Sequence, residues 1–273
     1  MALPLSPQVF AITARLIEER AGLHYELANT DLLADRLSER ALELGLDSLL
    51  DYYYFLRYDE KGAAELSTLI ETLVVHETYF FRELEALGVL VDSVVPQLLS
   101  ARPRLRIWSA ACATGEEPYT LGMLLGDAGL LDRVELVASD ISEKALAHAR
   151  SGVYGGRSLR IVPKHARPGH LLPETAGRVR VQDELRHRVA WRRVNLVDPA
   201  AVSALGLFDV ILCRNVLIYF ADSTVAQVAR NLGDALTRDG WLLVGASESL
   251  LRFGTLFKCH ERGASFFYRK ALE

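Results

Sequence analysis

Four short apolar runs, separated by stretches with helical periodicity, constrain the fold of this chain more than any other feature. The runs are LRIWSA (105–110), VELVASD (134–140), FDVILCRN (208–215) and GWLLVGAS (240–247). Strands that alternate with helices favour a mostly parallel sheet covered by helices on both faces. The sequence therefore predicts a doubly wound α/β fold in the part of the chain that contains these runs.

The first 75 residues have a different pattern, because nothing in them reads as a strand. Ser6 and Pro7 form a cap and first-turn pair before an amphipathic helix that Gly22 ends. Three further helical periodicities follow, one ending at Gly45, one after Asp47 and one after Gly62. We therefore expect an all-helical amino-terminal domain over residues 1–75 and an α/β domain over residues 76–273.

Three segments of the second domain fall outside the regular alternation. We expect a helix from about Thr78 to Leu99 at its start and an antiparallel strand over Gly263–Lys270 at its end. The runs VRVQ (179–182) and RVAWRRVNL (188–196) predict a short β-meander. This would place a small β-subdomain within the segment 157–196.

Charge is distributed unevenly along the chain. Residues 1–70 hold six basic and twelve acidic side chains, whereas residues 157–193 hold ten Lys or Arg and three acids. One hypothesis is that the basic segment engages an acidic partner, and the alternative is an ordinary solvated face. Nucleic acid is a poor partner, because no recognition fold is indicated and the net charge is −4. The arginines available for such contacts are Arg186, Arg188, Arg192 and Arg193.

Composition and termini suggest a cytoplasmic globular protein without membrane insertion. Half of the residues are hydrophobic and 24% are charged, which suits packed cores. No apolar run reaches the roughly 18 residues of a membrane span, and the first residues lack a signal-peptide pattern. The three cysteines show no CxxC spacing, so neither disulfides nor a metal site is expected.

The run SAACATGEEPYT (109–120) follows the first predicted strand and is the first candidate ligand site. Ligands of open α/β sheets bind beyond the carboxyl ends of the strands. With one glycine and no Gly-Lys pair, the run is neither a dinucleotide fingerprint nor a P-loop. Its acids, Glu116 and Glu117, disfavour phosphate and favour a cationic ligand such as S-adenosylmethionine, although they also suit any helix start.

Polar residues follow the other predicted strands as well. Asp140 ends the second strand, where an acid commonly binds ribose hydroxyls or caps the next helix. Arg214 and Asn215 close a long apolar strand and are difficult to explain as core residues. Asn195 and Leu196, at the end of the run RVAWRRVNL, are the fourth candidate ligand site.

Five strings taken together resemble the chemotaxis protein methyltransferases of the CheR family. They are HETYFFRE (76–83), SAACATGEEPYT (109–120), ASDISEKALAHARSGVY (138–154), FDVILCRNVLIYF (208–220) and GASESL (245–250). The resemblance covers nearly the whole chain. It implies a class I S-adenosylmethionine-dependent enzyme that esterifies chemoreceptor glutamates and releases S-adenosylhomocysteine, without a metal.

The resemblance also implies roles for individual positions. The two residues expected at the reacting centre are Arg82 and Tyr219. The residues expected to bind the cofactor are His76, Thr78, Arg82, Glu117, Asp140, Asn195, Leu196, Arg214 and Asn215. Among them Glu117 matches the contact to the amino group and Asp140 the contact to the ribose. The expected partners are chemoreceptor helices and, at the β-subdomain edge, a receptor carboxyl-terminal peptide.

Alternatives remain open from the sequence. A catalytically silent module that binds S-adenosylmethionine or S-adenosylhomocysteine would keep the pocket without transfer. A methyltransferase acting on a non-receptor protein would keep the cofactor pocket and the methyl transfer. A methyltransferase acting on a small molecule would need an enclosed acceptor pocket. A dehydrogenase conflicts with the missing glycine fingerprint.

Overall fold

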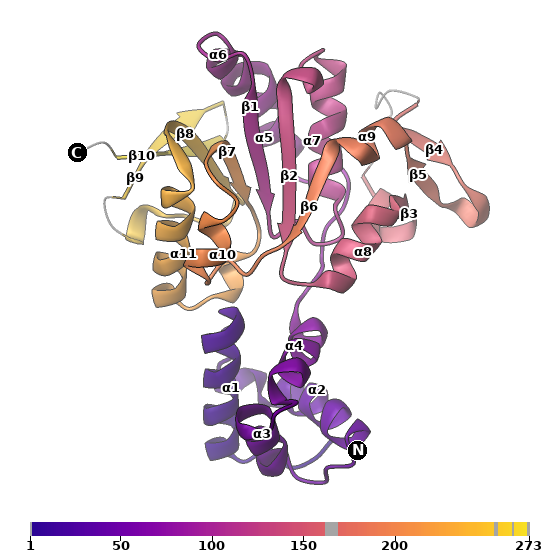
Figure 1. Cartoon of the computed structure of the whole chain (residues 1–273), viewed down its shortest axis with the longest axis vertical. Helices are drawn as coiled ribbons and strands as arrows, with labels where there is room; N and C mark the ends of the chain where they lie inside the picture. Colours follow the sequence, from indigo (N-terminus) through magenta and orange to yellow (C-terminus); the bar gives the residue numbers. More distant parts are fainter. Residues whose placement is uncertain (1, 162–168, 254–255, 264, 272–273) are drawn as a thin grey trace. The chain divides into compact units, whose positions relative to one another are not determined.

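The computed structural model describes residues 2–161, 169–253, 256–263 and 265–271. The chain divides into two compact units, drawn in Figure 1. The helical unit comprises residues 1–75 with 219–224, and the α/β unit comprises residues 76–218 with 225–273. Part of the predicted basic segment, residues 162–168, lies outside the described residues.

The helical unit is built from amphipathic helices with well-defined ends. Its helices are α1 (Pro7–Ala21), α2 (Thr30–Glu43), α3 (Leu49–Tyr58) and α4 (Gly62–Leu73), with a 3-10 turn at Leu27–Asn29. Helix α1 begins where the Ser6 hydroxyl accepts a hydrogen bond from Val9 N–H, at 3.3 Å. It ends at Gly22, which adopts φ 77° and donates its N–H to Glu18 O.

A buried ion pair connects three of these helices. The Arg40 guanidinium on α2 donates to both oxygens of Glu65 on α4, at 2.9 and 2.7 Å. The Tyr52 hydroxyl on α3 donates to the same carboxylate at 2.7 Å. Burial, followed by the contact with Glu65, raises the pKa of Tyr52 well above its ordinary value. The neutral phenol therefore remains a donor at any physiological pH.

The α/β unit contains a seven-stranded sheet in the order β6-β2-β1-β7-β8-β10-β9. The strands are β1 (Leu105–Ala110), β2 (Val134–Asp140), β6 (Val189–Arg193), β7 (Phe208–Cys213), β8 (Leu236–Val244), β9 (Phe257–Arg262) and β10 (Ser265–Lys270). The first five strands of the sheet order are parallel, whereas β10 runs antiparallel to both β8 and β9. The predicted doubly wound fold is confirmed, and the final antiparallel strand is present.

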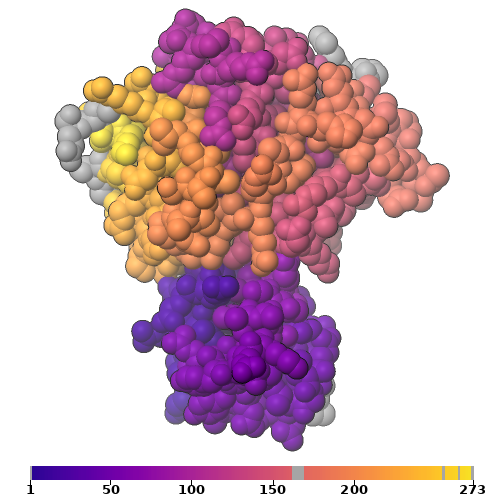
Figure 2. All heavy atoms as spheres, viewed as in Figure 1, coloured from indigo at the N-terminus to yellow at the C-terminus, as the bar shows by residue number. Residues whose placement is uncertain are grey.

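Helices lie on both faces of this sheet (Figure 1). They are α5 (Leu84–Val89), α6 (Val95–Leu99), α7 (Glu116–Asp127), α8 (Glu143–Ser151), α9 (Asp183–Arg188), α10 (Pro199–Ser203) and α11 (Asp222–Asp234). Single helical turns occur at Leu131–Arg133, Gly156–Leu159, Thr175–Gly177, Leu217–Tyr219 and Leu251–Phe253. Segments far apart in the sequence, coloured magenta, orange and yellow, share one face of the α/β unit (Figure 2).

A second, three-stranded antiparallel sheet has the order β3-β5-β4. Its strands are β3 (Val153–Tyr154), β4 (Leu171–Pro173) and β5 (Val179–Val181). The predicted meander is therefore wrong: β5 belongs to this small sheet, whereas β6 pairs in parallel with β2 at the edge of the large one. Helix α9 separates the two strands, and a parallel pairing depends on distant residues that local periodicity does not reveal.

The predicted helix over Thr78–Leu99 is wrong in its first part. Helix α5 begins at Leu84, and a turn precedes it in which Phe81 and Glu83 have φ of 63° and 50°. A π-helical turn at Leu90–Val94 then separates α5 from α6. Pro96 in α6 has no N–H to donate to the preceding turn, which explains a break there.

None of the three cysteines forms a disulfide bond. Cys112, Cys213 and Cys259 are free thiols, the first two buried. Burial, with smaller contributions from Asp140 and Glu117, raises the pKa of Cys112, so this thiol is not a reactive nucleophile. Among the described residues, no group of side chains is suited to a metal ion, and no helix is long and apolar enough to cross a bilayer.

Candidate active site

Four of the sequence-predicted site residues lie where parallel strands end, namely Glu117, Asp140, Arg214 and Asn215. Strands β2, β1, β7 and β8 are neighbours in the sheet and run in the same direction. The loops that follow them therefore meet at one edge. These loops hold Asp140, residues 111–117, Arg214 with Asn215, and residues 245–248.

The loop after β1 has a backbone conformation that excludes large side chains. Ala111 and Ala113 have φ of 55° and 48°, and Gly115 has φ of 93°. A Cβ atom on Gly115 would lie 2.7 Å from Ala149 Cβ and 2.9 Å from the Trp191 ring. Positive φ values outside glycine are uncommon and concentrate at functional sites. The small residues of the sequence run therefore serve a tight backbone path.

Asp140 fixes this loop to the end of β2. Its carboxylate accepts hydrogen bonds from Ala113 N–H and Ser142 N–H, each at 2.9 Å. The first of these bonds reaches across to the β1 loop, and the second closes a turn ahead of α8. Asp140 is not the cap of that helix, because Ser142 takes this position and its hydroxyl accepts from Ala145 N–H at 3.0 Å. Asp140 is 6% exposed, so it connects two strand ends from a buried position.

The two acids at the start of α7 have different environments. Glu116 is 1% exposed, and its carboxylate accepts from the hydroxyls of Thr114 and Ser158, both at 2.7 Å. Glu117 accepts from the Ser109 hydroxyl at 2.7 Å and from the Arg214 guanidinium at 2.8 Å. Its side chain is 15% exposed, so Glu117 can still meet a ligand whereas Glu116 is enclosed.

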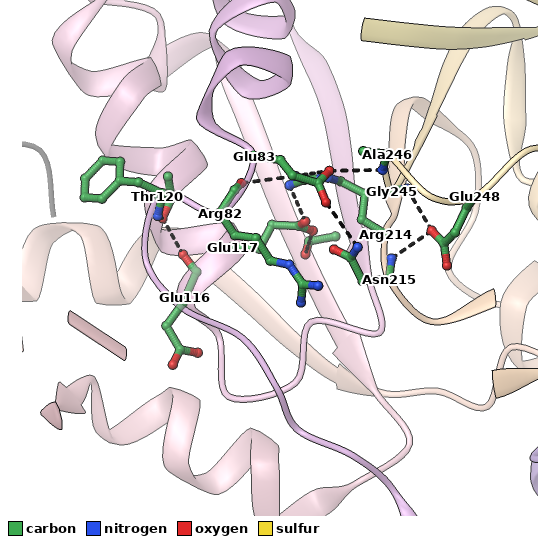
Figure 3. A network of polar contacts seen from close by, with 12 residues as sticks. Arg82, Glu83, Glu116, Glu117, Thr120, Arg214, Asn215, Gly245, Ala246 and Glu248 are labelled. Carbon is green, nitrogen blue, oxygen red and sulfur yellow. Dashed lines mark hydrogen bonds and ion pairs between the residues drawn. The ribbon is translucent and has the colours of Figure 1, made fainter. Parts of the chain in front are cut away.

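Arg214 lies between two carboxylates, as Figure 3 shows. Its guanidinium donates to Glu117 at 2.8 Å and to Glu83 at 2.9 Å, and its side chain is only 1% exposed. Burial would lower the pKa of Arg214, but the two carboxylates outweigh it and raise the pKa above its ordinary value. Nε of Arg214 is buried without a hydrogen-bond partner among the described residues. The guanidinium is a permanent cation that holds both acids in place.

Glu83 and Glu248 hold the loops after β7 and β8. Glu83 accepts from the Asn215 side-chain amide at 3.1 Å and from Ala246 N–H at 3.2 Å. Glu248 accepts from Gly245 N–H and Asn215 N–H, at 2.7 and 2.8 Å (Figure 3). It also accepts from Leu217 N–H, at 2.7 Å. Asn215 itself has φ 59°. The carboxylates thus stabilise a loop in which Asn215 lies in the left-handed region, a conformation that asparagine adopts more readily than most residues.

The segment before α5 joins this network through its backbone. Phe81 N–H donates to the Thr120 hydroxyl at 3.1 Å, and Arg82 O accepts from Arg214 at 3.1 Å. The Arg82 guanidinium extends away from the network (Figure 3) and donates to Glu77 O at 2.7 Å. Nε2 of His76 is buried and has no partner among the described residues, and Thr78 is half-buried.

The remaining predicted residues are placed differently. Leu196 is buried after β6, and its carbonyl accepts from the Asn231 amide at 2.9 Å. The Asn195 side chain accepts from Val197 N–H at 3.3 Å. Tyr219 is not part of this unit, because residues 219–224 belong to the helical unit, where Tyr219 O accepts from His24 N–H at 2.9 Å.

Comparison with protein families identifies both units. The family description "CheR methyltransferase, SAM binding domain" matches residues 76–265, and "CheR methyltransferase, all-alpha domain" matches residues 8–74. The chain belongs to the CheR methyltransferase family. The resemblance in its motifs is confirmed, and so is the predicted class of enzyme, a protein-glutamate methyltransferase that uses S-adenosylmethionine. Chemoreceptors are the substrates that follow from a chemotaxis methyltransferase.

Named relatives agree with this assignment over most of the chain. Chemotaxis protein methyltransferase 2 of Vibrio cholerae is 34% identical over 244 residues, which span 88% of this chain and 84% of that protein. The Salmonella typhimurium chemotaxis protein methyltransferase is 35% identical and covers 90% and 85%. The probable biofilm formation methyltransferase WspC of Pseudomonas putida is 37% identical, covering 87% of this chain and 56% of that protein.

Similarity to solved structures is weaker. Magnesium protoporphyrin IX methyltransferase from Synechocystis, with bound S-adenosylmethionine, aligns with a TM-score of 0.36 and 17% identity, covering 80% of this chain and 88% of the other. TrmN from Thermus thermophilus aligns with a TM-score of 0.41 and 17% identity, covering 67% and 49%.

The chemistry of the strand ends in this CheR family member fits S-adenosylmethionine. That cofactor has an ammonium and a sulfonium and lacks phosphate. Carboxylates predominate at the edge, which holds Glu83, Glu117, Asp140 and Glu248. Arg214, the single buried cation among the described residues, forms ion pairs with the first two. Several backbone N–H groups that could bind a phosphate already donate to these carboxylates. The edge is therefore suited to a cationic ligand.

Sequence reasoning did not assign Glu83 and Glu248 to the site. Both occur in strings that it did use, HETYFFRE and GASESL. Glu83 follows Arg82 directly, and Glu248 follows the Gly245 turn, where a Cβ atom would lie 2.7 Å from the Asn215 amide. An acid three residues after a glycine at a strand end was the available signal, but its partners are distant in sequence.

Proposed function

We propose that this enzyme methylates glutamates on chemoreceptor helices with the residues that meet at the carboxyl edge of its sheet. S-adenosylmethionine supplies an activated methyl group on a sulfonium. A glutamate side chain, with an ordinary pKa near 4.3, is already ionised at neutral pH and needs no general base. The chain therefore has to bind the cofactor and the glutamate, align them and exclude water. Such positioning lowers the activation barrier by up to about 7 to 11 kcal/mol.

One observation supports this assignment most directly. Glu117, with its contacts to Ser109 and Arg214, follows β1, and Asp140 ends the neighbouring strand β2. Glu117, held by Ser109 and Arg214, would bind the cofactor ammonium. Asp140, at the neighbouring strand end, would bind the ribose hydroxyls. We propose that Asn195, Leu196 and Asn215 line the adenosine part of the pocket.

Arg214 is buried and paired, so its proposed role differs from that of an exposed arginine that binds a ligand directly. Its guanidinium is already bound by Glu83 and Glu117. We therefore propose that it contributes to the adenosine pocket by fixing the loop that also holds Asn215.

Arg82, His76 and Thr78 complete the proposed site in the α/β unit. The Arg82 side chain is partly exposed and donates to a carbonyl rather than a carboxylate, so it keeps donors for the methionine carboxylate or the substrate glutamate. His76 offers the unpartnered Nε2. For Tyr219, which belongs to the helical unit, a contact of its ring face with the sulfonium stays a prediction of the family resemblance. An overly strong ion pair with the substrate would slow the reaction, because the carboxylate charge is lost in the ester.

For substrate docking, the basic segment divides into paired and available arginines. Arg186 and Arg188 bind Asp183 and Asp132, at 2.7 and 2.6 Å. Arg192 and Arg193 are exposed and donate to backbone carbonyls, and neither forms an ion pair with the described residues. We propose that this second pair attracts the acidic receptor. The edge strand β4 of the small sheet is the proposed place for a receptor carboxyl-terminal peptide.

The proposal places the reaction in the cytoplasm, where S-adenosylmethionine is made. Its first test is a calorimetric titration with S-adenosylhomocysteine of the wild type and of Asp140→Ala. We expect the substitution to weaken binding at least about 100-fold. It removes the proposed hydrogen bonds from the ribose hydroxyls to the Asp140 carboxylate, and each such bond contributes about 1.5 to 3 kcal/mol. Asp92→Ala, at an exposed position of the same unit, is the matched control and should bind like the wild type.

The second step of the test uses a purified receptor signalling fragment and methyl-labelled S-adenosylmethionine. A base-labile methyl ester that disappears when the receptor glutamates are replaced by alanine would support the proposal. A folded wild type that binds no S-adenosylhomocysteine would contradict it.

A further inference from the structure

Glu83 has an unusual position for a residue outside the strands. It lies between the segment 76–82 and α5, in the left-handed region with φ 50° and ψ 49°. Its side chain is 25% exposed, and each of its carboxylate oxygens accepts from the loop after β7. One oxygen also accepts from Ala246 N–H in the loop after β8. A single carboxylate therefore connects three segments that are distant in sequence.

The contact with Arg214 extends the influence of Glu83 to the proposed ammonium contact. One terminal nitrogen of Arg214 donates to Glu83 and the other donates to Glu117. Because the Arg214 side chain is 1% exposed, water cannot replace a lost partner easily. Removing the charge of Glu83 would let the guanidinium shift toward Glu117 and compete with a cationic ligand for that carboxylate.

Electrostatics agree with a fully ionised Glu83. Burial would raise the pKa of its carboxyl, but the Arg214 charge, the Arg214 and Asn215 hydrogen bonds and Ala246 N–H outweigh burial and lower the pKa. The charge is thus present throughout the physiological range, and it balances one half of the Arg214 cation.

We propose that Glu83 is a positioning residue for the cofactor, acting through Arg214 on Glu117. This inference rests on the proposed function, because it takes Glu117 as the ammonium contact. Glu248 provides the contrast: it binds three backbone N–H groups and has no hydrogen bond to Arg214 or Glu117 among the described residues. Glu248 therefore supports only the backbone of the loops and does not act on Glu117.

The test is a double-mutant cycle on binding of S-adenosylhomocysteine, measured by calorimetry. We expect Glu83→Gln to weaken binding about tenfold in the wild-type background, or about 1.4 kcal/mol, because the Arg214 cation loses one of its two charged partners. In a Glu117→Gln background the same change should weaken binding less than about twofold, because the residue through which it acts has lost its charge. Glu248→Gln should weaken binding by the same factor in both backgrounds.

Glu85→Gln is the matched control, because Glu85 is exposed and lies two residues further along the chain. It should bind like the wild type. If Glu83→Gln does not fold, Glu83→Asp keeps the charge but shortens the side chain, and the same non-additivity with Glu117→Gln is expected.

Two outcomes would overturn the inference while leaving the proposed function intact. In the first, Glu83→Gln binds S-adenosylhomocysteine as tightly as the wild type. In the second, Glu83→Gln weakens binding by the same factor in the wild-type and the Glu117→Gln backgrounds, which is the behaviour of a purely structural residue. Failure of the folded wild type to bind would instead contradict the proposed function, so the two failures are distinguishable.

Discussion

Both units of this chain contain an arginine between acidic partners, yet the two networks differ in what they connect. In the helical unit Arg40 and the Tyr52 hydroxyl satisfy Glu65 within helices of ordinary geometry. In the α/β unit Arg214 joins Glu83 and Glu117 among loops with positive φ, and its Nε has no partner among the described residues. The same chemistry thus stabilises packing in one place and shapes a binding site in the other.

The difference follows from the elements on which the charges lie. Helices satisfy their own backbone groups, so a carboxylate among them needs only its side-chain partners. Loops at strand ends leave N–H groups without partners, and Glu83, Asp140 and Glu248 bind these groups. A network of the second kind determines backbone conformation as well as charge.

The largest expected effect comes from removing the two arginines separately. Arg214→Met and Arg40→Met should each lower the free energy of unfolding by about 3 to 5 kcal/mol. The first leaves Glu83 and Glu117, and the second leaves Glu65, at most 25% exposed and without a counter-charge. Only Arg214→Met should abolish binding of S-adenosylhomocysteine. The three tryptophans, Trp108, Trp191 and Trp241, all lie in the α/β unit, so urea unfolding followed by tryptophan fluorescence reports that unit, and circular dichroism reports the helical unit as well.

The control is Arg238→Met, an exposed position that should change stability by less than about 0.5 kcal/mol. If Arg40→Met also abolished ligand binding, the contrast between a structural and a site-forming network would be wrong.

A smaller effect is expected from two glycines with similar backbone conformations. Gly45 in the helical unit has φ 75° and no atom within 4 Å of the place a Cβ would take, whereas Gly115 has φ 93° and three close neighbours there. Gly45→Ala should cost about 1 kcal/mol of stability from strain alone. Gly115→Ala should cost about 2 to 4 kcal/mol and weaken ligand binding, because a close contact adds to the strain.

Urea unfolding and calorimetry of these two variants provide the measurement. Equal costs at both glycines would show that the close approach of Ala149 and Trp191 to the β1 loop is not a constraint.

The smallest effect concerns pH. The pKa of Glu83 is lower in the folded protein than its ordinary value, so its contribution to stability is present above the unfolded-state pKa of about 4.3 and is lost as pH falls through the folded value. The stability difference between the wild type and Glu83→Gln should be constant from about pH 7 to pH 5 and decrease below about pH 4.3. Urea unfolding at several pH values tests this. A difference that grows on acidification would reverse the sign and contradict the prediction.

Local signals in the sequence were sufficient for the main architecture. Ser6, Pro7 and Gly22 indicated both ends of the first helix, and apolar runs predicted β1, β2, β7 and β8. These features depend on residues a few positions apart. The β-meander and the start of the helix near Thr78 were predicted wrongly, because strand partners and the strained turn at Phe81 depend on contacts with distant residues.

By itself, the sequence determined that this chain has a helical domain followed by a doubly wound methyltransferase domain, because periodicity and motifs are local. Only the tertiary structure decided which acids act together. Glu116 is enclosed by Thr114 and Ser158, whereas the adjacent Glu117 reaches Arg214, 97 residues away, and through it Glu83. Neighbouring residues of one type differ in this way because burial and hydrogen-bond partners are set by the packing of distant segments, which no local pattern records.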